Sequence, residues 1–493
     1  MKKTYSLLLT FSLIAVVLAG CGKCGTCTSD VAKGDPSKPN VIYILADDMG
    51  YGDLSFLGQT AFSTANIDKM ATEGLVMTQH YTGSTVCAPS RAALMTGKHT
   101  GHTSVRGNAP AQLLLDEEVT IAEVFKSAGY KTGAIGKWGI GHPPEPSDPH
   151  RNGFDHFYGY INMWHAHNFY PEFLYRNGEK VKIPGNKLMD VEFDSLDETR
   201  EGAGVAEIKE TYAHDLFDQE ALEFIEDNKD NPFFLYMAYN VPHANNEAGY
   251  LLGDGMEVKD YGRFADKDWP NPEKGFAKMM ENLDNSVGII VEKLEELGLT
   301  ENTIVVFSTD NGPHEEGGHV MEFFNSNGDL RGQKRDLYDG GVKTPMIIKW
   351  PAKIKAGSST DHISAFWDFL PTMADLLDVD APEGIDGISM LPSWLGNDEE
   401  QEAHDYLYWE FYELGGRQAV LQGEYKAVRL NVRTGKPSPT ELYHLPTDPD
   451  ENDNLADMMP EKALEMEELM NEAHEPLSFM SLFEGSVDAE TRF

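Results

Sequence analysis

The sequence predicts an α/β fold with a second, smaller sheet near the C-terminus, and three observations favour this fold class. Short apolar runs alternate with longer amphipathic segments along most of the 493-residue chain, as they do in sheets covered by helices. After about residue 386 the pattern changes to closely spaced short runs. Hydrophobic residues make up 41% and charged residues 25%, which is ordinary globular composition and excludes a largely disordered chain.

Four buried strands are predicted, because four short runs are rich in β-branched or aromatic residues and are followed at once by polar residues or glycine. They are residues 41–46, 130–135, 233–239 and 304–308. Helical patterns lie between them, at residues 121–128, 212–228 and 275–297. This alternation favours a parallel sheet with right-handed crossovers. Residues 186–210 are acidic and weakly patterned, and we expect a surface loop there.

The C-terminal pattern predicts a small antiparallel sheet with one packing helix. The expected strands are residues 406–411, 418–421, 425–430 and 441–445, and the expected helix is residues 461–473. Residues 384–405 have the composition of a linker. The sequence therefore predicts a large domain at residues 39–385 and a C-terminal domain at residues 386–493.

The N-terminus has the layout of a bacterial export signal at residues 1–20. Two lysines precede an apolar run that is too short to span a membrane stably. Small residues before Cys21 resemble a lipobox, so we expect an exported, periplasmic or cell-surface lipoprotein anchored in a membrane through Cys21, with residues 21–38 as a flexible tether. Ordinary signal cleavage is the alternative. The CxxCxxC spacing at Cys21 is more typical of a solvated tether than of a metal site.

The formal net charge of −41 excludes nucleic acid as a partner, since nucleic-acid binding needs basic patches. The same charge repels anionic substrates at long range. An anionic substrate would therefore require strong positive charge within the site itself.

Polar residues follow each of the four predicted central strands, where ligands collect in parallel α/β sheets. They are Asp47 and Asp48, Lys137, His243, and Asp310 and Asn311. A single acidic pair after a strand is more often a cap or loop feature, but four coincidences on one sheet edge favour a site. The four oxygen donors suit a hard cation, and the absence of a His or Cys cluster disfavours zinc. We expect Ca²⁺, with Mg²⁺ as second choice.

Cys87 lies at the predicted start of a helix that has Pro89 near its first position and Gly97 as its stop. Backbone N–H groups and the helix dipole favour an anion there, and Arg91 adds a positive charge one turn on. We therefore expect a stabilised nucleophile or oxyanion at this position. A buried structural cysteine is the alternative.

The segment Cys87-Ala88-Pro89-Ser90-Arg91 resembles the C-x-P-S-R signature of type I sulfatases, and Met95-Thr96-Gly97-Lys98 continues it. The resemblance covers most of the chain from Pro39 onward, through Gly50-Tyr51-Gly52-Asp53, Gly136-Lys137-Trp138, Pro242-His243 and Thr309-Asp310-Asn311-Gly312. It implies an alkaline-phosphatase-like α/β fold, in which helices sandwich a large mixed sheet and a smaller C-terminal α+β domain carries an antiparallel sheet plus helix. Residues 39–385 would be the catalytic domain.

The same resemblance implies hydrolysis of sulfate esters by a modified cysteine. A formylglycine-generating or anaerobic sulfatase-maturating enzyme would oxidise Cys87 to formylglycine. One hydroxyl of the hydrated aldehyde would attack sulfur, and the second would then expel sulfate and restore the aldehyde. The implied calcium site comprises Asp47, Asp48, the modified Cys87, Asp310 and Asn311. The ion would act as a Lewis acid.

Besides Cys87 and Arg91 of the signature, three further residues match catalytic positions of the family, and each of the three contacts the sulfate group there. Lys137 and Lys334 would hold the sulfate and supply local positive charge, although a solvated surface lysine is the alternative for each. His243 would contact the sulfate and protonate the departing alcohol as a general acid. A loop histidine at a strand end is the alternative for His243.

One departure from the family concerns Gly139, which occupies a position where the family commonly has histidine. Candidates to replace that histidine are His142, His165, His167 and His314. Gly139, the H-x-H pair and Asn325-Ser326-Asn327-Gly328 are similar to bacterial polysaccharide sulfatases that act on sulfated galactose-type sugars. We therefore expect a sulfated carbohydrate substrate, carrageenan-like or glycosaminoglycan, bound by His165, His167, His314 and Arg331. An H-x-H pair can also be a metal pair.

Two other functions remain open from the sequence. Phosphonate or phosphate ester hydrolases of the same superfamily share the metal site and even the C-x-P-S-R signature. A glycan-binding lipoprotein with a degenerate site is conceivable because of Gly139. Intact Cys87, Arg91 and Lys137 argue against the second of these.

Overall fold

The computed structural model describes residues 38–108, 113–141, 148–191 and 200–477. The export signal predicted at residues 1–20, the anchor residue Cys21 and nearly all of the tether lie outside these ranges, and so does His142. Within the described ranges, no helix is both long enough and apolar enough to span a bilayer.

The large sheet is built around the four strands predicted from the sequence. They are β1 (Asn40–Asp47), β3 (Lys131–Lys137), β9 (Phe233–Pro242) and β10 (Thr303–Thr309). β1 lies parallel to both β9 and β10, and β3 lies parallel to β9. Since these strands are buried along nearly their whole length, continuous apolar runs were the correct signal for them.

Within the described ranges the sheet has 11 strands in the order β12-β2-β11-β10-β1-β9-β3-β4-β5-β6, with β13 paired to β2. It is mixed, as the family resemblance implied, because β11 runs antiparallel to β10 and to β2. The remaining members are β2 (Leu75–Tyr81), β4 (His156–Tyr160), β5 (Phe173–Arg176), β6 (Glu179–Lys182), β11 (Lys343–Lys349), β12 (Ser358–Thr360) and β13 (Ser364–Ala365). A short pair, β7 (Lys187–Leu188) and β8 (Ala206–Ile208), lies within the stretch that we predicted to be a loop.

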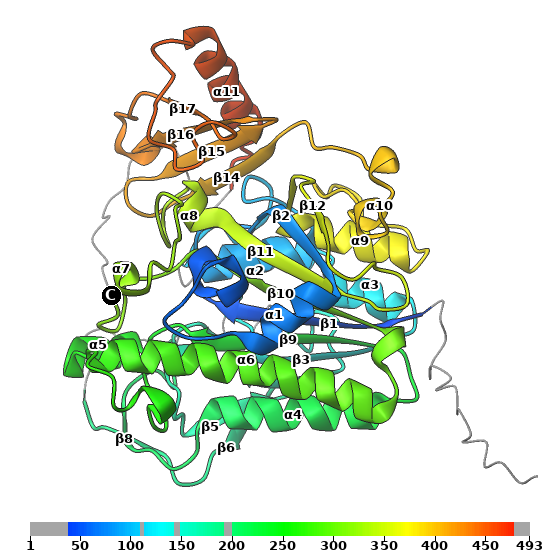
Figure 1. Cartoon of the computed structure of the whole chain (residues 1–493), viewed down its shortest axis with the longest axis vertical. Coiled ribbons are helices and arrows are strands. Elements are labelled where there is room, and N and C mark those ends of the chain that lie inside the picture. The colour runs from blue at the N-terminus through cyan, green and yellow to red at the C-terminus, as the bar shows by residue number, and fades with distance from the viewer. Residues whose placement is uncertain (1–37, 109–112, 142–147, 192–199, 478–493) are drawn as a thin grey trace, which may run out of the picture. The chain divides into compact units, whose positions relative to one another are not determined.

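Helices cover both faces of the large sheet (Figure 1). Alternate side chains of β1 show this directly, since Ile42 and Ile44 belong to one apolar core and Val41 and Tyr43 to the other. The first core is completed by α1 (Ala65–Glu73), α4 (Ala213–Asn228) and α6 (Asn271–Leu297). The second is completed by α2 (Cys87–Thr96), α3 (Ile121–Ser127) and α9 (Phe369–Leu376).

Local sequence signals set the ends of these helices. The side chain of Thr120 accepts a hydrogen bond from the backbone N–H of Glu123, and the carboxylate of Glu123 accepts one from the backbone N–H of Thr120. This capping box starts α3. Gly97 ends α2 in the left-handed conformation, at φ 71°, and its N–H donates to the carbonyl of Ala93. Shorter helices are α5 (Asn246–Leu252), α7 (Met321–Phe324) and α8 (Asp339–Val342).

The predicted C-terminal sheet and helix are confirmed. β14 (Leu407–Phe411), β15 (Arg417–Gln422), β16 (Tyr425–Leu430) and β17 (Glu441–His444) form an antiparallel sheet, and α11 (Pro460–Glu472) packs on it. The other face of this sheet shares a core with the large unit, in which the ring of Trp409 contacts Tyr81 and Trp367.

The structure differs from the linker predicted at residues 384–405, because part of this segment is packed against the large unit. Residues 384–405 contain α10 (Leu391–Trp394), and the side chains of Met390 and Trp394 are buried in the core shared with α9. Apolar residues spaced among glycine and acidic residues concealed this packing in the sequence. The division of the chain at residues 385 and 386 stays a prediction.

Candidate active site

Two central strands, β1 and β10, and the turns that follow them bring the predicted oxygen donors together. Asp47 ends β1 and Asp48 follows it, while Asp310 and Asn311 come directly after β10. The backbone N–H of Asp48 donates to Oδ1 of Asp310 at 3.1 Å, and Nδ2 of Asn311 donates to Oδ1 of Asp48 at 2.7 Å. All four side chains are buried. The carboxyl ends of parallel strands lie at the same edge of a sheet, and this brings the four residues together.

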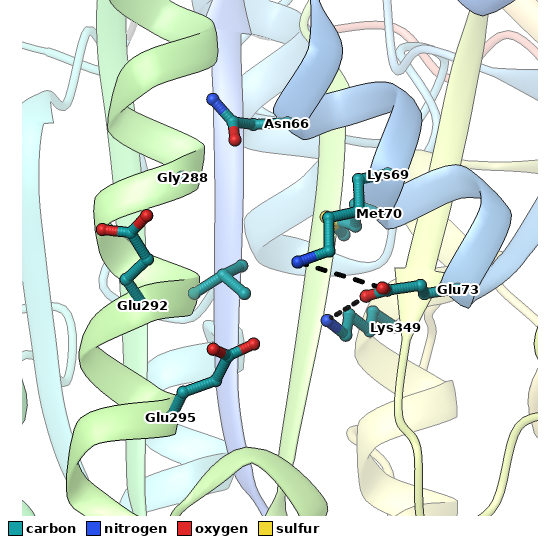
Figure 2. Close-up of a pocket in the computed structure, with 9 residues that line it drawn as sticks. Asn66, Lys69, Met70, Glu73, Gly288, Glu292, Glu295 and Lys349 are labelled. Carbon is teal, nitrogen blue, oxygen red and sulfur yellow. Dashed lines mark hydrogen bonds and ion pairs between the residues drawn. The ribbon is translucent and has the colours of Figure 1, made fainter.

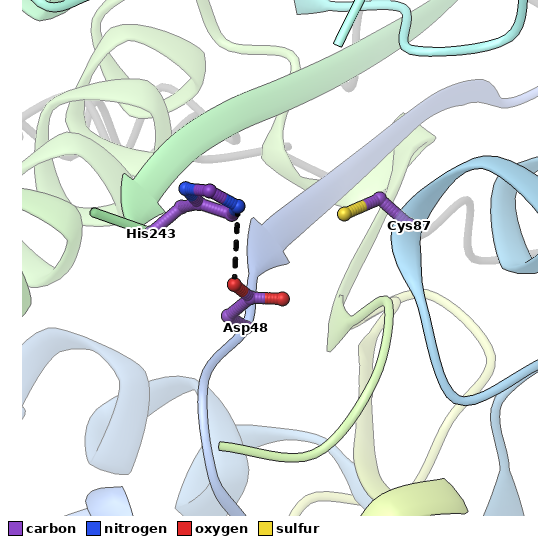
Figure 3. Close-up of side chains that lie close together, drawn as sticks. All are labelled: Asp48, Cys87 and His243. Carbon is purple, nitrogen blue, oxygen red and sulfur yellow. Dashed lines mark ion pairs between the residues drawn. The ribbon is translucent and has the colours of Figure 1, made fainter. Parts of the chain in front are cut away.

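Cys87 faces this group from the first residue of α2 (Figure 3). Its Sγ atom and single ligand atoms of Asp48 and His243 all lie within 4.8 Å of one another, and the same is true of Cys87, Asp47 and Asp310. Nζ of Lys137 donates to the sulfur at 3.3 Å and to Oδ2 of Asp47 at 2.7 Å. The residue expected to become the nucleophile therefore lies beside the oxygen cluster.

The Cys87 thiol lies among carboxylates that oppose its ionisation. Burial raises the pKa of the Cys87 thiol far above its usual range. The charge of Lys137 lowers this pKa, but the carboxylates of Asp47, Asp310 and Asp48 raise it. The guanidinium of Arg91 contacts Asp310, with its Nη2 atom 2.8 Å from Oδ2. A protonated thiol is a poor nucleophile, so the geometry favours a different reactive group at position 87.

The oxygen cluster fits a divalent cation. Oδ1 of Asp47 and Oδ1 of Asn311 are buried and have no hydrogen-bond partner among the described residues, whereas buried polar atoms are normally satisfied. Burial raises the pKa of Asp310 to about 7, and the neighbouring Asp47 and Asp48 add to the rise although Arg91 opposes it. A cation among these oxygens would offset that repulsion, and hard oxygen donors suit calcium or magnesium.

Lys334 reaches the same site from the loop after β10. Its Nζ atom lies 2.8 Å from Oδ2 of Asp48, 2.9 Å from Oε2 of Glu316 and 3.2 Å from Nε2 of His243. Glu316 was missed in the sequence, although it stands six residues after Asp310 in a polar segment that follows a buried strand. It also pairs with Arg335 at 2.7 Å. Glu316 therefore holds the two cations of this loop together.

The surroundings of His243 favour its neutral form. Its Nδ1–H donates to the carbonyl of Ala244 at 2.6 Å, so its Nε2 atom is free to accept from Lys334. Burial lowers the pKa of His243 well below its usual value, and the charge of Lys334 lowers it further. The nearby His314 uses both ring nitrogens, donating from Nε2 to the carbonyl of Pro242 and accepting at Nδ1 from the N–H of Glu316.

The H-x-H pair divides between the site and the core. His167 stacks on His243 with ring centroids 4.8 Å apart, and its Nδ1 atom lies 3.2 Å from a carboxylate oxygen of Glu247. His165 is a correction, because its side chain is fully buried and packs on Tyr160 and Phe173 rather than facing the site. Burial lowers the pKa of His165 to about 3.

Arg331 is a second correction to the expected sugar-binding set. Its guanidinium lies 3.8 Å from the ring centroid of Tyr338 and donates to Oη of Tyr443 at 3.0 Å and to the carbonyl of Glu451 at 2.6 Å. The side chain therefore fastens the loop that carries Lys334 to the C-terminal sheet. A motif rich in Arg and Lys next to a site does not distinguish these two roles in the sequence.

Position 139 borders the cationic side of the site. Gly139 has a φ of 73°, and a Cβ atom there would lie 3.4 Å from Cδ of Arg91 and 3.5 Å from Cε of Lys137. A side chain at this position would therefore begin beside the aliphatic parts of Arg91 and Lys137. In this chain that buried position carries no side chain, because residue 139 is glycine.

A shallow hollow elsewhere has different chemistry (Figure 2). It lies between α1 and α6, where Glu73 contacts Lys69 at 3.9 Å and Lys349 at 2.7 Å. Lys349 pairs with Val305 near the start of β10, whereas Asp310 follows the end of that strand. The hollow therefore belongs to the opposite edge of the sheet.

Comparisons with known proteins agree with this geometry. A family profile described as "Sulfatase" matches residues 39–379, and one described as "N-sulphoglucosamine sulphohydrolase, C-terminal" matches residues 332–478. The chain is 32% identical to N-acetylgalactosamine-6-sulfatase of Mus musculus over 419 residues, which cover 80% of this chain and 73% of the relative. It is 28% identical to N-acetylgalactosamine-6-O-sulfatase of Bacteroides thetaiotaomicron over 530 residues, which cover 93% and 98%.

Solved structures share the fold as well. The crystal structure of Ps i-CgsB in complex with k-i-k-neocarrahexaose matches with a TM-score of 0.71 and 26% identity, over 88% of this chain and 92% of that chain. The structure of Ps i-CgsB alone matches with a TM-score of 0.73 over 91% of this chain and 95% of that chain, also at 26% identity.

Proposed function

The chain belongs to the sulfatase family, an alkaline-phosphatase-like group of sulfate ester hydrolases, and we propose from this premise that it removes sulfate from galactose-type sugars of a sulfated polysaccharide or its oligosaccharides. The observation that carries the proposal is the convergence of Cys87 with Asp47, Asp48 and Asp310. Two relatives are N-acetylgalactosamine-6-sulfatases, and a similar solved structure holds a neocarrahexaose. All three point to galactose-type sugars.

The family implies a formylglycine, and its place in this chain is Cys87. When hydrated, the aldehyde supplies one hydroxyl to attack sulfur and a second to release sulfate. The raised pKa of the Cys87 thiol supports the need for this modification, since burial and the adjacent carboxylates keep the sulfur protonated. A formylglycine-generating or anaerobic sulfatase-maturating enzyme is the partner that this proposal requires.

The family also implies a metal, and calcium is the ion that we propose. Asp47, Asp48, Asp310 and Asn311 would hold it, together with the modified side chain at position 87. A bound ion of this kind supplies Lewis-acid polarisation and neutralises charge on sulfate oxygens. Two buried oxygens that accept no hydrogen bond from the described residues, Oδ1 of Asp47 and Oδ1 of Asn311, support the proposal, although Arg91 forms an ion pair with the first at 3.3 Å. Magnesium is the second choice, because it demands stricter octahedral geometry.

The cationic side chains are suited to binding the sulfate group. Lys137 and Lys334 are both buried, at 1% and 5% exposure, so their charges act in a medium of low dielectric constant. Arg91 holds Asp310 and Asp47 in place from behind. Because the chain has a net charge of −41, attraction of an anion must come from positive charges within the site. The buried lysines supply that local charge.

His243 is the residue that we propose to protonate the departing alcohol. Its Nε2 atom accepts from Lys334 and lies 3.3 Å from Oδ2 of Asp48. The negative charge of a bound sulfate ester would raise the pKa of His243 from its low value, because an opposite charge nearby favours the protonated ring.

We further propose that the chain is exported and anchored by a lipid at Cys21. The support is the order of charged, apolar and small residues in the first 21 positions. Such an anchor would hold the enzyme at the cell envelope, where polysaccharide fragments arrive.

The proposal is tested by measuring sulfate release from defined carrageenan and 6-sulfated chondroitin oligosaccharides, with protein made beside a maturating enzyme. Wild type should release sulfate from at least one of them, and Cys87→Ala should not. The rival phosphate or phosphonate ester hydrolase is tested with aryl sulfate and aryl phosphate esters in parallel. Faster turnover of the phosphate ester, without release of sulfate from any oligosaccharide, would contradict the proposal.

A further inference from the structure

Helix α5 lies against both sides of the candidate site. Glu247 on its first turn contacts His167, which in turn stacks on His243. On the other side, Gly249 packs so closely on the loop of Glu316 that a Cβ atom there would lie 2.6 Å from Cα of Gly317. The helix is therefore part of the wall around the sulfate-binding residues.

The outward face of α5 is apolar and exposed. The side chain of Tyr250 is 88% exposed and that of Leu252 is 54% exposed. The facing segment is exposed too, at Val320 and at Phe323 of α7. The two segments adjoin where α5 ends, because a Cβ atom at Gly318 would lie 2.6 Å from the carbonyl oxygen of Gly253, the residue that follows α5.

We call the set of Tyr250, Leu251, Leu252, Val320 and Phe323 the α5–α7 surface. Its five members are among the thirteen large hydrophobic side chains that are exposed in the described part of the chain. Scattered exposed apolar residues need no explanation, but a concentration of them beside a site indicates binding. The surface continues from the wall of the site, so the same ligand can reach both.

Resting on the function proposed above, we infer that the α5–α7 surface binds an uncharged sugar residue of the substrate chain next to the sulfated one, with the ring of Tyr250 stacked against it. Aromatic rings supply a large, rigid, partly polar contact of the kind that carbohydrate sites use. The charge of the protein supports an uncharged occupant, because a net charge of −41 disfavours any anion outside the cationic pocket.

Two carboxyl groups at the border strengthen this choice of sugar. Glu315 precedes Glu316, and Glu322 lies within α7. Burial and the interaction with Glu322 raise the pKa of Glu315, which shows that the two groups crowd one another. A second sulfate placed here would meet this negative charge, whereas a neutral hexose would not.

The test compares substrates of different length. KM is measured for a sulfated carrageenan tetrasaccharide in which the residue next to the sulfated galactose is uncharged, and for the corresponding sulfated monosaccharide, in wild type and in Tyr250→Ala. The ratio of the monosaccharide KM to the tetrasaccharide KM should fall about fivefold in the variant, which corresponds to the loss of one aromatic contact. Tyr250→Phe should restore the ratio, because the ring is retained. Met458→Ala, which alters a side chain that is 79% exposed in the C-terminal part, is the matched control.

An unchanged ratio in Tyr250→Ala would overturn the inference while leaving the proposed function intact. Failure of wild type to release sulfate from any sugar would instead count against the proposed function. The molar mass of wild type and variant in solution tests whether a second copy of the chain occupies the surface instead. A dimer that Tyr250→Ala dissociates would show that the surface joins two copies of the chain, and this would overturn the inference too.

Discussion

The ammonium group of Lys137 lies 3.3 Å from the Sγ atom of Cys87, at the point where the end of β3 meets the start of α2. Neither residue is exposed by more than 2%. A fixed positive charge thus stands beside the residue that is to be modified, within reach of anything bound to it.

Replacing Lys137 by Met should lower kcat for an aryl sulfate by about 10²–10³, since a buried cation aimed at developing charge contributes on that scale. Steady-state kinetics on matured protein is the measurement. Lys126→Met, which removes a surface pair with Asp155, should change kcat little. A Lys137→Met enzyme within a factor of about two of wild type would rule out a role for this charge.

Cys87 should carry an aldehyde in protein made beside a maturating enzyme and a thiol in protein made without one. Mass spectrometry of the tryptic peptide that contains residue 87 distinguishes the two forms. Activity should rise in proportion to the aldehyde fraction, because the buried thiol stays protonated. Full activity in protein that carries only the thiol would disprove formylglycine chemistry.

Asp310→Ala should remove the metal and lower activity by about 10²–10³ through lost charge stabilisation. Elemental analysis should find calcium in wild type and much less in the variant. The surface control is Asp215→Ala, where the carboxylate pairs only with the exposed Lys259 among the described residues. Chelation followed by addition of Ca²⁺ or Mg²⁺ identifies the ion, and better recovery with Mg²⁺ would reverse our choice.

Glu316→Gln should lower kcat/KM by about tenfold or more, because the hydrogen bonds that hold Lys334 and Arg335 lose their charged partner. The neighbouring Glu315→Gln is the matched control, since Glu315 is exposed and, among the described residues, the carboxylate that pairs with Lys334 on this turn is that of Glu316. Equal kinetics for the two variants would show that Lys334 keeps its position without Glu316.

His165→Phe should reduce the acid sensitivity of folding and leave turnover close to wild type. Burial holds the pKa of His165 near 3 in the folded protein, below its value of about 6.5 in the unfolded chain. The unfolded state therefore binds a proton that the folded state does not, and stability is lost as pH falls from 6.5 towards 3, by about 1.4 kcal/mol per pH unit.

The difference in unfolding midpoint between wild type and His165→Phe, measured from pH 7 to pH 4, checks this slope. A large rise in KM for the sugar substrate would instead restore His165 to the substrate site, contrary to its packing on Tyr160 and Phe173.

The centre of the fold and the oxygen cluster were accessible from the sequence, because both follow from one strong pattern. Strands such as β1 and β9 are apolar throughout and end in polar residues, so the pattern predicts the strand and the position of Asp47 or His243 together. Strands at the sheet margin such as β6 lack this signal, since its residues are mostly exposed.

Side-chain direction was not accessible in the same way. His165 and His167 are separated by one residue in a 3-10 turn, yet one packs in the core and the other stacks on His243. Arg331 and Lys334 belong to one basic motif, yet Arg331 contacts Tyr338 and Lys334 contacts Asp48. Tertiary packing decided each case, and residue type did not.

The loop that carries Lys334 is anchored to the small sheet at both of its ends. Arg331 donates to Oη of Tyr443 in β17 at 3.0 Å, and Arg417 of β15 donates to the carbonyl of Arg335 at 2.6 Å. A fragment trimmed to the large sheet alone would lose these anchors and would leave Lys334 unsupported. The smallest autonomous catalyst that could be cut from this protein must therefore retain the β14–β17 sheet, which rules out using residues 39–385 as a portable enzyme module.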